Sequence, residues 1–558
     1  MELELSARER SGAPETASLL SLGRGSSGPA PPVQRDPLTF RAVAIGCLVG
    51  MVTATMNVSF GLKAGWSQGG SILAAVVSIG VFSAMRPSLP FTAGEANICQ
   101  TTASAAGMMT MAAGFAGPIP ALQMLGYEYS TTLLLLWAFS VCYLGVFFAA
   151  PLRQALVVKE NLRFPTGTAT YHTILSMFAE GGEATARSRL LFRSAVLAAA
   201  WTTLGYFLPF LEKPKLLPHI GLGALARLGW GINLDLQLIG GGMLCGVHTG
   251  CSIFAGAVVA WGILAPAVHA AGWAPGPFQD YGTGVRGWVL WPGVALMVGD
   301  ALSSFVISVP WRHLLPPSMR PQPRTPRPNA SDGDSDNPFD PHAFHDDEPD
   351  GLRGIPLSWS VGGLVASSAC TASVLSSSFG LPPWQPLLAV VVAALLSYIA
   401  VRCTGETDIN PVGGMGKVTQ LIFAVIAPNQ IVTNLMAAAV AGAAASQAGD
   451  LSQDFKAGRL LKTCPRKQFA AQLIGIPFGA LAAVPVYRLF QAAYTFGGEE
   501  APAPAAQAWK AVAEVLSRGT GALPPMSGIA MGIALAVGAA LPVLSRGGRR
   551  AGAGAGGG

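Results

Sequence analysis

Apolar stretches about twenty residues long recur from Phe40 to Leu544, and this repetition constrains the fold more than any other feature. A helix needs about 20 apolar residues to cross the hydrocarbon core of a bilayer. Hydrophobic residues make up 51% of the chain and charged residues only 11%, against about 25% charged in soluble proteins. The sequence therefore predicts an all-α, polytopic integral membrane protein embedded in a lipid bilayer. It excludes a soluble enzyme, a disulfide scaffold and a nucleic-acid-binding protein.

Fourteen of these stretches are candidate membrane spans. In the first part of the chain they are 40–62, 70–88, 95–115, 130–150, 190–211, 234–249, 250–270 and 288–309. In the second part they are 358–380, 384–402, 405–426, 429–448, 467–491 and 526–545.

Lysine and arginine gather in the short polar segments between these spans. The clusters are Arg35/Arg41, Arg86, Arg153/Lys159/Arg163, Arg187/Arg189/Arg193, Arg312 to Arg327, Arg402, Lys456 to Lys467 and Arg546 to Arg550. An even number of expected spans separates each cluster from the next, so all clusters can lie on the cytoplasmic side that basic residues favour. We therefore expect a multi-pass protein of the inner (cytoplasmic) membrane with both termini in the cytoplasm.

The domain organisation follows from changes in composition. We expect a disordered cytoplasmic N-terminal tail at 1–37, a first membrane half at 38–315, a hydrophilic Pro-rich and acidic linker at 316–354, a second membrane half at 355–545 and a disordered basic, Gly-rich tail at 546–558. Asp332, Asp334 and Asp336 imitate the start of a calcium loop, but Asn337 replaces its glycine. Weak metal capture with His342 and His345 is the alternative to a solvated, disordered linker. The eight scattered cysteines are expected to be small buried residues, so we expect no metal site and no cofactor.

Two short motifs recur in the same order in the two halves. Ser59–Leu62 matches Ser378–Leu381, and Gly94–Ile98 matches Gly405–Ile409. Because an even number of expected spans separates the copies, the repeat predicts two parallel-related halves, an arrangement known in transporters with a substrate site between the halves. Shared low-complexity composition is the alternative explanation.

The second copy of this motif carries ionisable groups at an expected span. A charge inside a bilayer costs about 2.5–3.5 kcal/mol, so such groups are candidates for function. Pro411 and its neighbouring glycines are expected to break the helix, which would expose backbone groups as ligands. Primary candidates for substrate binding and proton coupling are Glu406, Asp408, Asn410, Lys417 and Gln420, with Glu95 and Asn97 in the first copy. The alternative places Glu406 and Asp408 just outside the membrane, solvated beside Arg402.

Other polar residues are secondary candidates. The stretch 164–180 lies between two basic clusters and is too short to cross twice, so it is either re-entrant or an amphipathic connector. Its Thr166, Thr168, Tyr171 and His172 are candidate substrate contacts. His248 lies at an expected break between two spans, where it is either a proton relay or a packing residue. Close helix contacts are expected at Gly46/Gly50, Gly242/Gly246/Gly250, Gly475/Gly479 and Gly528/Gly532.

Four blocks resemble the oligopeptide transporter superfamily, including its yellow-stripe-like branch, and specifically its prokaryotic members. They are Gly405–Gln420, Leu162–Ala169, Leu234–Pro266, and Leu451–Gly458 followed by Pro465-Arg466. The resemblance extends over about residues 40–545 and implies secondary transport of small peptides or metal chelates with protons. It also implies about sixteen membrane segments, so we expect 14–16 helices, some re-entrant or broken. The linker has no counterpart in this resemblance.

The leading functional hypothesis is a secondary active transporter, a proton-coupled symporter of oligopeptides or metal-chelate complexes that works by alternating access. The chain has no G-x-x-x-x-G-K-[ST] phosphate loop, so its energy is expected to come from an ion gradient or a partner. The alternative is a passive channel or receptor-like protein without ion coupling. A membrane-embedded hydrolase would need Asp280 and Asp300 as its acid pair, but neither has the expected sequence context, so we expect no enzyme and no catalytic residues. The sequence leaves the cargo and the oligomeric state open.

Overall fold

The computed structural model describes residues 36–65, 67–85, 87–178, 183–278, 280, 283–308, 354–498, 500–518 and 523–555. The chain divides into two units, Met1–Pro37 and Leu38–Gly558, and the second unit contains all the helices given below. Most of the expected N-terminal tail (1–37) and of the expected linker (316–354) lies outside the described residues, as do residues 556–558. The part of the chain that is described contains helices and no strand.

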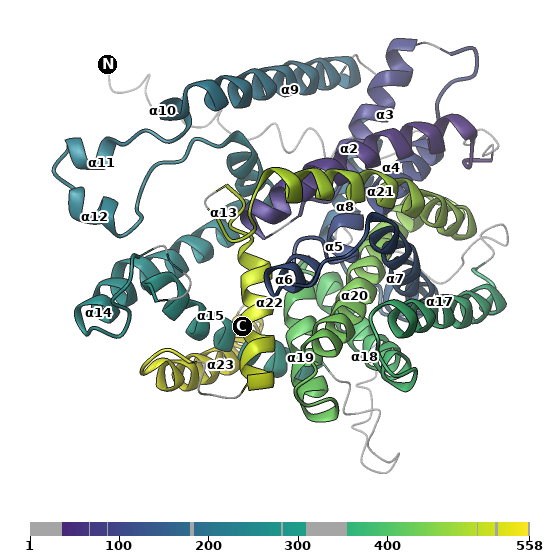
Figure 1. Ribbon diagram of the computed structural model, residues 1–558. Helices are drawn as coiled ribbons and strands as arrows, with labels where there is room; N and C mark the ends of the chain where they lie inside the picture. Colours follow the sequence, from purple (N-terminus) through teal and green to yellow (C-terminus); the bar gives the residue numbers. More distant parts are fainter. Residues whose placement is uncertain are drawn as a thin grey trace, which may run out of the picture. The chain divides into compact units, whose positions relative to one another are not determined.

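The helices of the first half begin directly after the N-terminal unit (Figure 1). They are α2 (Phe40–Ala64), α3 (Ser71–Met85), α4 (Ala93–Gly107), α5 (Met109–Ala112), α6 (Pro118–Met124), α7 (Thr131–Leu152) with a π-helical continuation (Arg153–Lys159), α8 (Pro165–Phe178), α9 (Glu183–Phe207), α10 (Pro209–Glu212), α11 (Leu216–His219), α12 (Gly223–Arg227), α13 (Leu236–Ala257) with a π-helical continuation (Val258–Leu264), α14 (Ala265–Ala270) and α15 (Val285–Ser308).

The second half has fewer and longer helices. They are α17 (Leu357–Ser378), α18 (Trp384–Thr407), α19 (Val412–Ile426), α20 (Ile431–Leu460), α21 (Pro465–Ala493), α22 (Pro504–Arg518) and α23 (Ser527–Ala555). The backbone of α23 therefore extends into the segment expected to be a C-terminal tail.

Eight helices among the described residues are long and apolar enough to cross a membrane, by length and composition. These spans are Phe40–Ala64, Thr131–Lys159, Gly250–Ala270, Leu357–Ser378, Trp384–Glu406, Ile431–Leu460, Pro465–Ala493 and Ser527–Leu544. Ser71–Met85 and Val412–Ile426 are apolar helices that are shorter. The protein is thus an all-α, polytopic membrane protein, and the total of 14–16 spans stays a prediction.

Four expected spans differ clearly from the observed helices. Residues 234–249 and 250–270 form one continuous helical run from Leu236 to Ala270, because no residue between them breaks the helix. The expected span 95–115 divides into α4 and α5. Helix α20 continues twelve residues beyond 448, the expected end of its span, to Leu460, although Asp450 and Asp454 lie in this extension.

Helix α4 is the most enclosed polar element of the fold. It has 15 residues, which at 1.5 Å per residue is about 22 Å and too short for a hydrocarbon core of about 30 Å. Thr92 and Glu95 form a capping box at its start, and Asn57 of α2 donates a hydrogen bond to the carbonyl of Gly107 at its end. All residues from Glu95 to Gly107 are buried. Its polar side chains are therefore separated from lipid by other helices.

Glycines on two neighbouring helices permit this enclosure. A Cβ added to Gly46 of α2 would lie 2.6 Å from the Cys99 carbonyl oxygen, and one added to Gly50 would lie 2.5 Å from the Ala106 Cβ. A Cβ on Gly475 or Gly479 of α21 would lie 2.3 Å or 2.2 Å from carbonyl oxygens of α4. The contacts expected at these two glycine pairs are confirmed, and α4 packs against both α2 and α21.

The other expected glycine contacts are not found at the described glycines, and the surroundings of Gly246 lie outside the described part of the structure. Gly242, Gly250, Gly528 and Gly532 have no neighbour within 4 Å of an added Cβ. Helices α15 and α23 instead pack through Gly299 and Gly538, whose added Cβ atoms would lie 2.3 Å and 2.1 Å from carbonyl oxygens of the opposite helix. Glycine spacing alone therefore does not identify which face of a helix is in contact.

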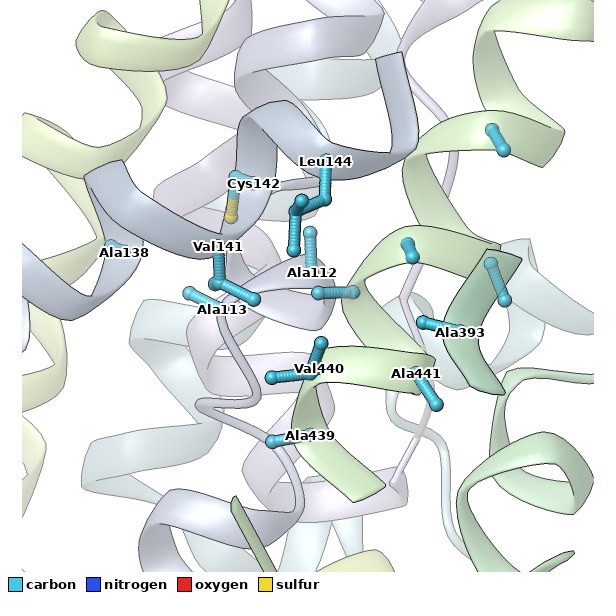
Figure 2. Packing of buried hydrophobic residues seen from close by; sticks show 14 of the residues in the cluster. Ala112, Ala113, Ala138, Val141, Cys142, Leu144, Ala393, Ala439, Val440 and Ala441 are labelled. Carbon is cyan, nitrogen blue, oxygen red and sulfur yellow. The ribbon is translucent and has the colours of Figure 1, made fainter. Parts of the chain in front are cut away.

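The hydrophobic core joins the two halves through small side chains. Figure 2 shows Ala138, Val141 and Leu144 of α7 beside Val440 and Ala441 of α20, with Ala112 of α5 between the two helices. Since lipid is as apolar as these residues, close packing rather than a hydrophobic driving force stabilises such contacts.

We predict that Gly479→Ala lowers the stability of the folded protein by about 1–3 kcal/mol, because the new methyl group would overpack the α4 interface. The matched change Gly528→Ala is expected to be neutral or slightly stabilising, since its Cβ meets open space. Thermal unfolding of both purified variants measures the difference. Equal unfolding temperatures would contradict the enclosure of α4.

Candidate functional site

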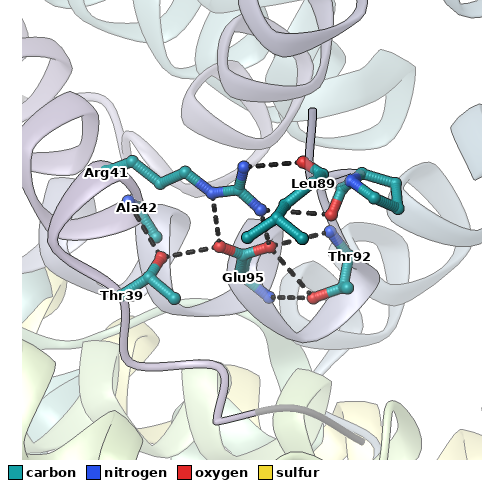
Figure 3. A network of polar contacts seen from close by, with 7 residues as sticks. Thr39, Arg41, Ala42, Leu89, Thr92 and Glu95 are labelled. Atoms are coloured by element: carbon teal, nitrogen blue, oxygen red, sulfur yellow. Dashed lines mark hydrogen bonds and ion pairs between the residues drawn. The ribbon is translucent and has the colours of Figure 1, made fainter. Parts of the chain in front are cut away.

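Glu95 is the most completely hydrogen-bonded of the sequence-predicted residues. Its carboxylate receives hydrogen bonds from Arg41 Nε and Arg41 Nη2, both at 2.7 Å, and from Thr39 Oγ1 at 2.7 Å. The backbone N–H of Thr92 also donates to it at 3.1 Å, as Figure 3 shows. Arg41 in turn donates to the carbonyls of Leu89 and Pro90. Glu95 thus joins the start of α2 to the start of α4.

Glu406 occupies a different environment, although the sequence repeat aligns it with Glu95. It lies on the last turn of α18 with a side chain 35% exposed, and it pairs with Arg402 at 3.1 Å. Arg402 also pairs with Glu160 at 2.8 Å. Glu95 lies in the first turn of α4, whereas Glu406 lies in the last turn of α18. The helix break therefore precedes the motif in the first half, but falls inside the motif, at 408–411, in the second half. The expected break at Pro411 is present.

Asp408 links this break to the start of α8. It has a left-handed backbone with φ of 66°. Its carboxylate accepts hydrogen bonds from the backbone N–H of Thr166 at 2.9 Å, from Thr166 Oγ1 at 2.7 Å and from Gln453 Nε2 at 3.2 Å. An acidic residue at a helix start satisfies free N–H groups. Asp408 and Thr166, predicted separately from the sequence, are therefore direct partners.

The loop before α8 is held by both α18 and α20. Phe164 donates its backbone N–H to the Gly405 carbonyl at 2.9 Å, and Lys456 donates to Asn161 Oδ1 at 2.9 Å. Arg459 donates to the carbonyls of Val157 and Val158. Asn161, Phe164 and Asp408 all have positive φ, and left-handed backbone outside glycine is concentrated at ligand clamps and switch regions.

The remaining primary candidates lie deeper. Asn410 donates to the carbonyl of Ala445 in α20 at 3.0 Å. Gln420 donates to Asn434 Oδ1 at 3.1 Å and to the Trp509 carbonyl at 3.2 Å. Lys417 is 2% exposed, with its Nζ 3.4 Å from the Gly413 carbonyl and 5.7 Å from the centre of the Trp509 ring. No carboxylate pairs with Lys417 in the described part of the chain.

The secondary candidates lie mostly along α8. Thr168 donates to the Arg163 carbonyl at 2.8 Å. The rings of Tyr171 and His172 meet edge to face with centroids 5.0 Å apart, and His172 is exposed. His248 lies within the continuous backbone of α13, and its side chain is outside the described residues.

A second group of polar side chains, all buried except the half-buried Asp450, connects α4 with α3, α20 and α21, and we call it the polar seam. Gln468 donates to Thr101 Oγ1 at 3.3 Å, and Gln472 donates to Gln447 Oε1 at 3.0 Å. Within α4, Gln100 donates to Asn97 Oδ1 at 3.0 Å. The seam consists of Ser71 of α3, Asn97, Gln100, Thr101 and Ser104 of α4, Gln447, Asp450 and Asp454 of α20, and Gln468 and Gln472 of α21.

Only Asn97 of the seam was predicted from the sequence. Asp450 and Asp454 were missed because the expected span ended at 448, which placed both in a cytoplasmic segment. The signal that could have revealed them is the helical spacing of Gln447, Asp450 and Asp454, which puts them on one face of a continued helix. The described residues contain no group of three or more His, Cys, Asp or Glu side chains able to hold a metal ion.

Comparison with known proteins identifies the family. The model of the family described as OPT oligopeptide transporter protein matches residues 37–552. The chain belongs to the oligopeptide transporter family. It is 27% identical to a Saccharomyces cerevisiae protein named as a putative oligopeptide transporter, over 87% of this chain and 83% of that protein. It is also 26% identical to a metal-nicotianamine transporter of Arabidopsis thaliana, over 88% of this chain and 80% of that protein.

This membership agrees with the resemblance seen in the sequence, and it makes the protein a multi-pass membrane transporter rather than an enzyme. A similar protein from Oryza sativa subsp. japonica, also named a metal-nicotianamine transporter, is 25% identical over 88% of this chain and 79% of its own length. The relatives thus include proteins named for peptides and proteins named for a metal chelate.

We predict that Glu95→Gln lowers stability by about 1–3 kcal/mol, because Arg41 loses a charged, doubly hydrogen-bonded partner. Glu406→Gln is the matched control, and it is expected to change stability by less than about 1 kcal/mol since its ion pair is exposed and screened. Unfolding curves of the two purified variants in the same detergent give both values. A larger loss for Glu406→Gln would reverse the assignment of the structural carboxylate.

Proposed function

We propose that this member of the oligopeptide transporter family is a proton-coupled symporter that moves its substrate by alternating access. The polar seam is the observation that supports the proposal. Ionisable and amide side chains are costly inside membrane helices. Where they occur, they usually mark an ion or substrate pathway. Asp454 is 2% exposed and lies within the candidate span Ile431–Leu460, where an aliphatic residue would be cheaper.

The proposed substrate is a small peptide or a metal-chelate complex that carries a carboxylate. The names of the relatives support both classes. Lys417 is a buried cation without a carboxylate partner among the described residues, so a substrate carboxylate would provide its missing counter-charge. Asn97 and Gln420 are buried members of the sequence-based set and have polar atoms without partners, Asn97 Nδ2 and Gln420 Oε1. We propose these three residues as substrate contacts.

Glu406 and Asp408 have a different proposed role. Asp408, with Thr166, joins the broken end of α18 to α8, and Glu406 holds Arg402 beside it. We propose that this junction is where the two helices separate or rejoin as the transporter changes the side to which it opens. The proposed location is the cytoplasmic membrane with both termini inside, which reporter proteins fused to either end would test.

The uptake experiment uses the full chain reconstituted in liposomes. We expect an inwardly directed proton gradient to drive accumulation of substrate above its external concentration. Di- to pentapeptides compete with iron and nickel chelates in the same assay to identify the cargo. Saturable uptake whose rate does not depend on the proton gradient would contradict coupling. Uptake that stops when the internal and external substrate concentrations are equal would support the alternative, a passive channel.

The role of Lys417 is tested with paired substrates. Lys417→Gln is expected to raise the KM for a peptide with a free carboxyl terminus and to leave the KM for its C-terminally amidated form unchanged. Lys417→Arg, which retains the charge, should preserve the preference for the free acid. An equal change in KM for the two peptides would remove Lys417 from carboxylate recognition.

A further inference from the structure

Asp450 and Asp454 are the two carboxylates of the polar seam. They lie four residues apart on α20, so their side chains are neighbours on one face of the helix. Both lie within the candidate span Ile431–Leu460. Neither belongs to the site predicted from the sequence, and neither is assigned a role above.

Three helices enclose Asp454. Ser71 of α3 donates to its Oδ1 at 3.3 Å, and the side chains of Gln100 and Ser104 of α4 lie against its carboxyl group. Gln468 of α21 donates to its backbone carbonyl at 2.8 Å. The surroundings thus consist of hydroxyl and amide groups, which can hydrogen-bond either an ionised or a protonated carboxyl group.

Fully buried polar atoms around the pair lack partners. Asp454 Oδ2 and Asp450 Oδ2 accept no hydrogen bond, and neither does Gln100 Oε1, on a side chain with 0% exposure. All three atoms are acceptors. The one seam donor without a partner among the described residues is Asn97 Nδ2, on an amide that contacts Gln100 through its Oδ1. A proton bound to a carboxyl group would place a donor directly at the unpartnered oxygens of Asp450 and Asp454.

Among the described residues, no basic side chain forms an ion pair with the two carboxylates. On α20 itself, Lys456 and Arg459 bind the loop before α8. On α4, Glu95 is paired with Arg41. On α21, Arg466 donates to the Gly354 carbonyl. The helices packed around this part of α20 carry further titratable groups, whereas α3 has none. They are Cys99 of α4, Cys142 and Tyr143 of α7, Arg153 and Lys159 of its π-helical continuation, Tyr171 and His172 of α8, Tyr398, Arg402, Cys403 and Glu406 of α18, and Lys467, Tyr487 and Arg488 of α21. None of them forms an ion pair with Asp450 or Asp454 in the described chain.

We propose that Asp450 and Asp454 together hold the proton that this transporter moves with its substrate. The proposal rests on the proton coupling proposed above. Two carboxylates one turn apart, each with a buried and unpartnered oxygen, cannot both ionise without a large cost. One proton bound to the pair removes the repulsion and supplies a donor at these oxygens. Movement of α4 or α21 would admit water to the seam. The hydrated carboxylate then releases its proton to that water on the side to which the substrate leaves.

The test compares Asp454→Asn with the wild-type transporter in liposomes that contain a pH-sensitive dye. Asparagine keeps the shape and hydrogen bonding of the side chain but cannot carry a proton. We expect Asp454→Asn to lose both gradient-driven accumulation and substrate-induced proton entry. Exchange of labelled for unlabelled substrate across the membrane should persist, because exchange needs no net proton movement. Persistent exchange also shows that the variant is folded.

Two further variants make the outcome specific. Asp450→Asn removes the neighbouring charge, so Asp454 should bind its proton less tightly and uptake should fall off at lower pH than in the wild type. Glu128→Gln removes an exposed carboxylate in the loop between α6 and α7 and should behave as the wild type. The inference would be overturned if the Asp454→Asn variant still accumulated substrate in response to the proton gradient. It would also be overturned if accumulation by the wild type followed a sodium gradient. A wild type that transports without any gradient dependence would instead overturn the proposed coupling.

Discussion

The close approach of α4 to α2 and α21 is the contact on which the rest of the structure depends. Gly46 and Gly50 on one side, and Gly475 and Gly479 on the other, bring backbone against backbone at distances that no side chain would permit. A 15-residue helix rich in threonine, serine, asparagine and glutamine would be unstable against lipid. Enclosed in this way, its polar atoms meet other polar atoms, and the polar seam forms.

The ionisable groups of the membrane part fall into two classes. Glu95, Asp408 and Arg402 have opposite charges or helix N–H groups as close partners, and they fix where α2, α8 and α18 begin or end. Asp454 and Lys417 are each 2% exposed and have no opposite charge beside them among the described residues. The first class maintains the architecture. The second class is suited to a mobile proton or an incoming carboxylate, and this division is the basis of the proposed mechanism.

The sequence predicts the fold class well and the site only in part. Long apolar stretches suffice to predict an all-α membrane protein, and Pro411 suffices to predict a break after α18. The alignment of Glu95 with Glu406 could not show that the two residues have different surroundings, because the position of a helix break depends on tertiary contacts such as Asp408 with Thr166. Asp450 and Asp454 were missed since the expected span ended with its apolar stretch at 448, and an apolar pattern cannot detect charges that are enclosed by α3, α4 and α21.

The central claim is that Asp454 carries a proton inside the membrane when the transporter is closed. Infrared difference spectroscopy of the protein in lipid, recorded before and after substrate is added, measures this directly. We predict a band from a protonated carboxyl group that changes when substrate binds and that is missing in Asp454→Asn. A difference spectrum containing only ionised carboxylate bands, or the same acid band in the variant, would contradict the account.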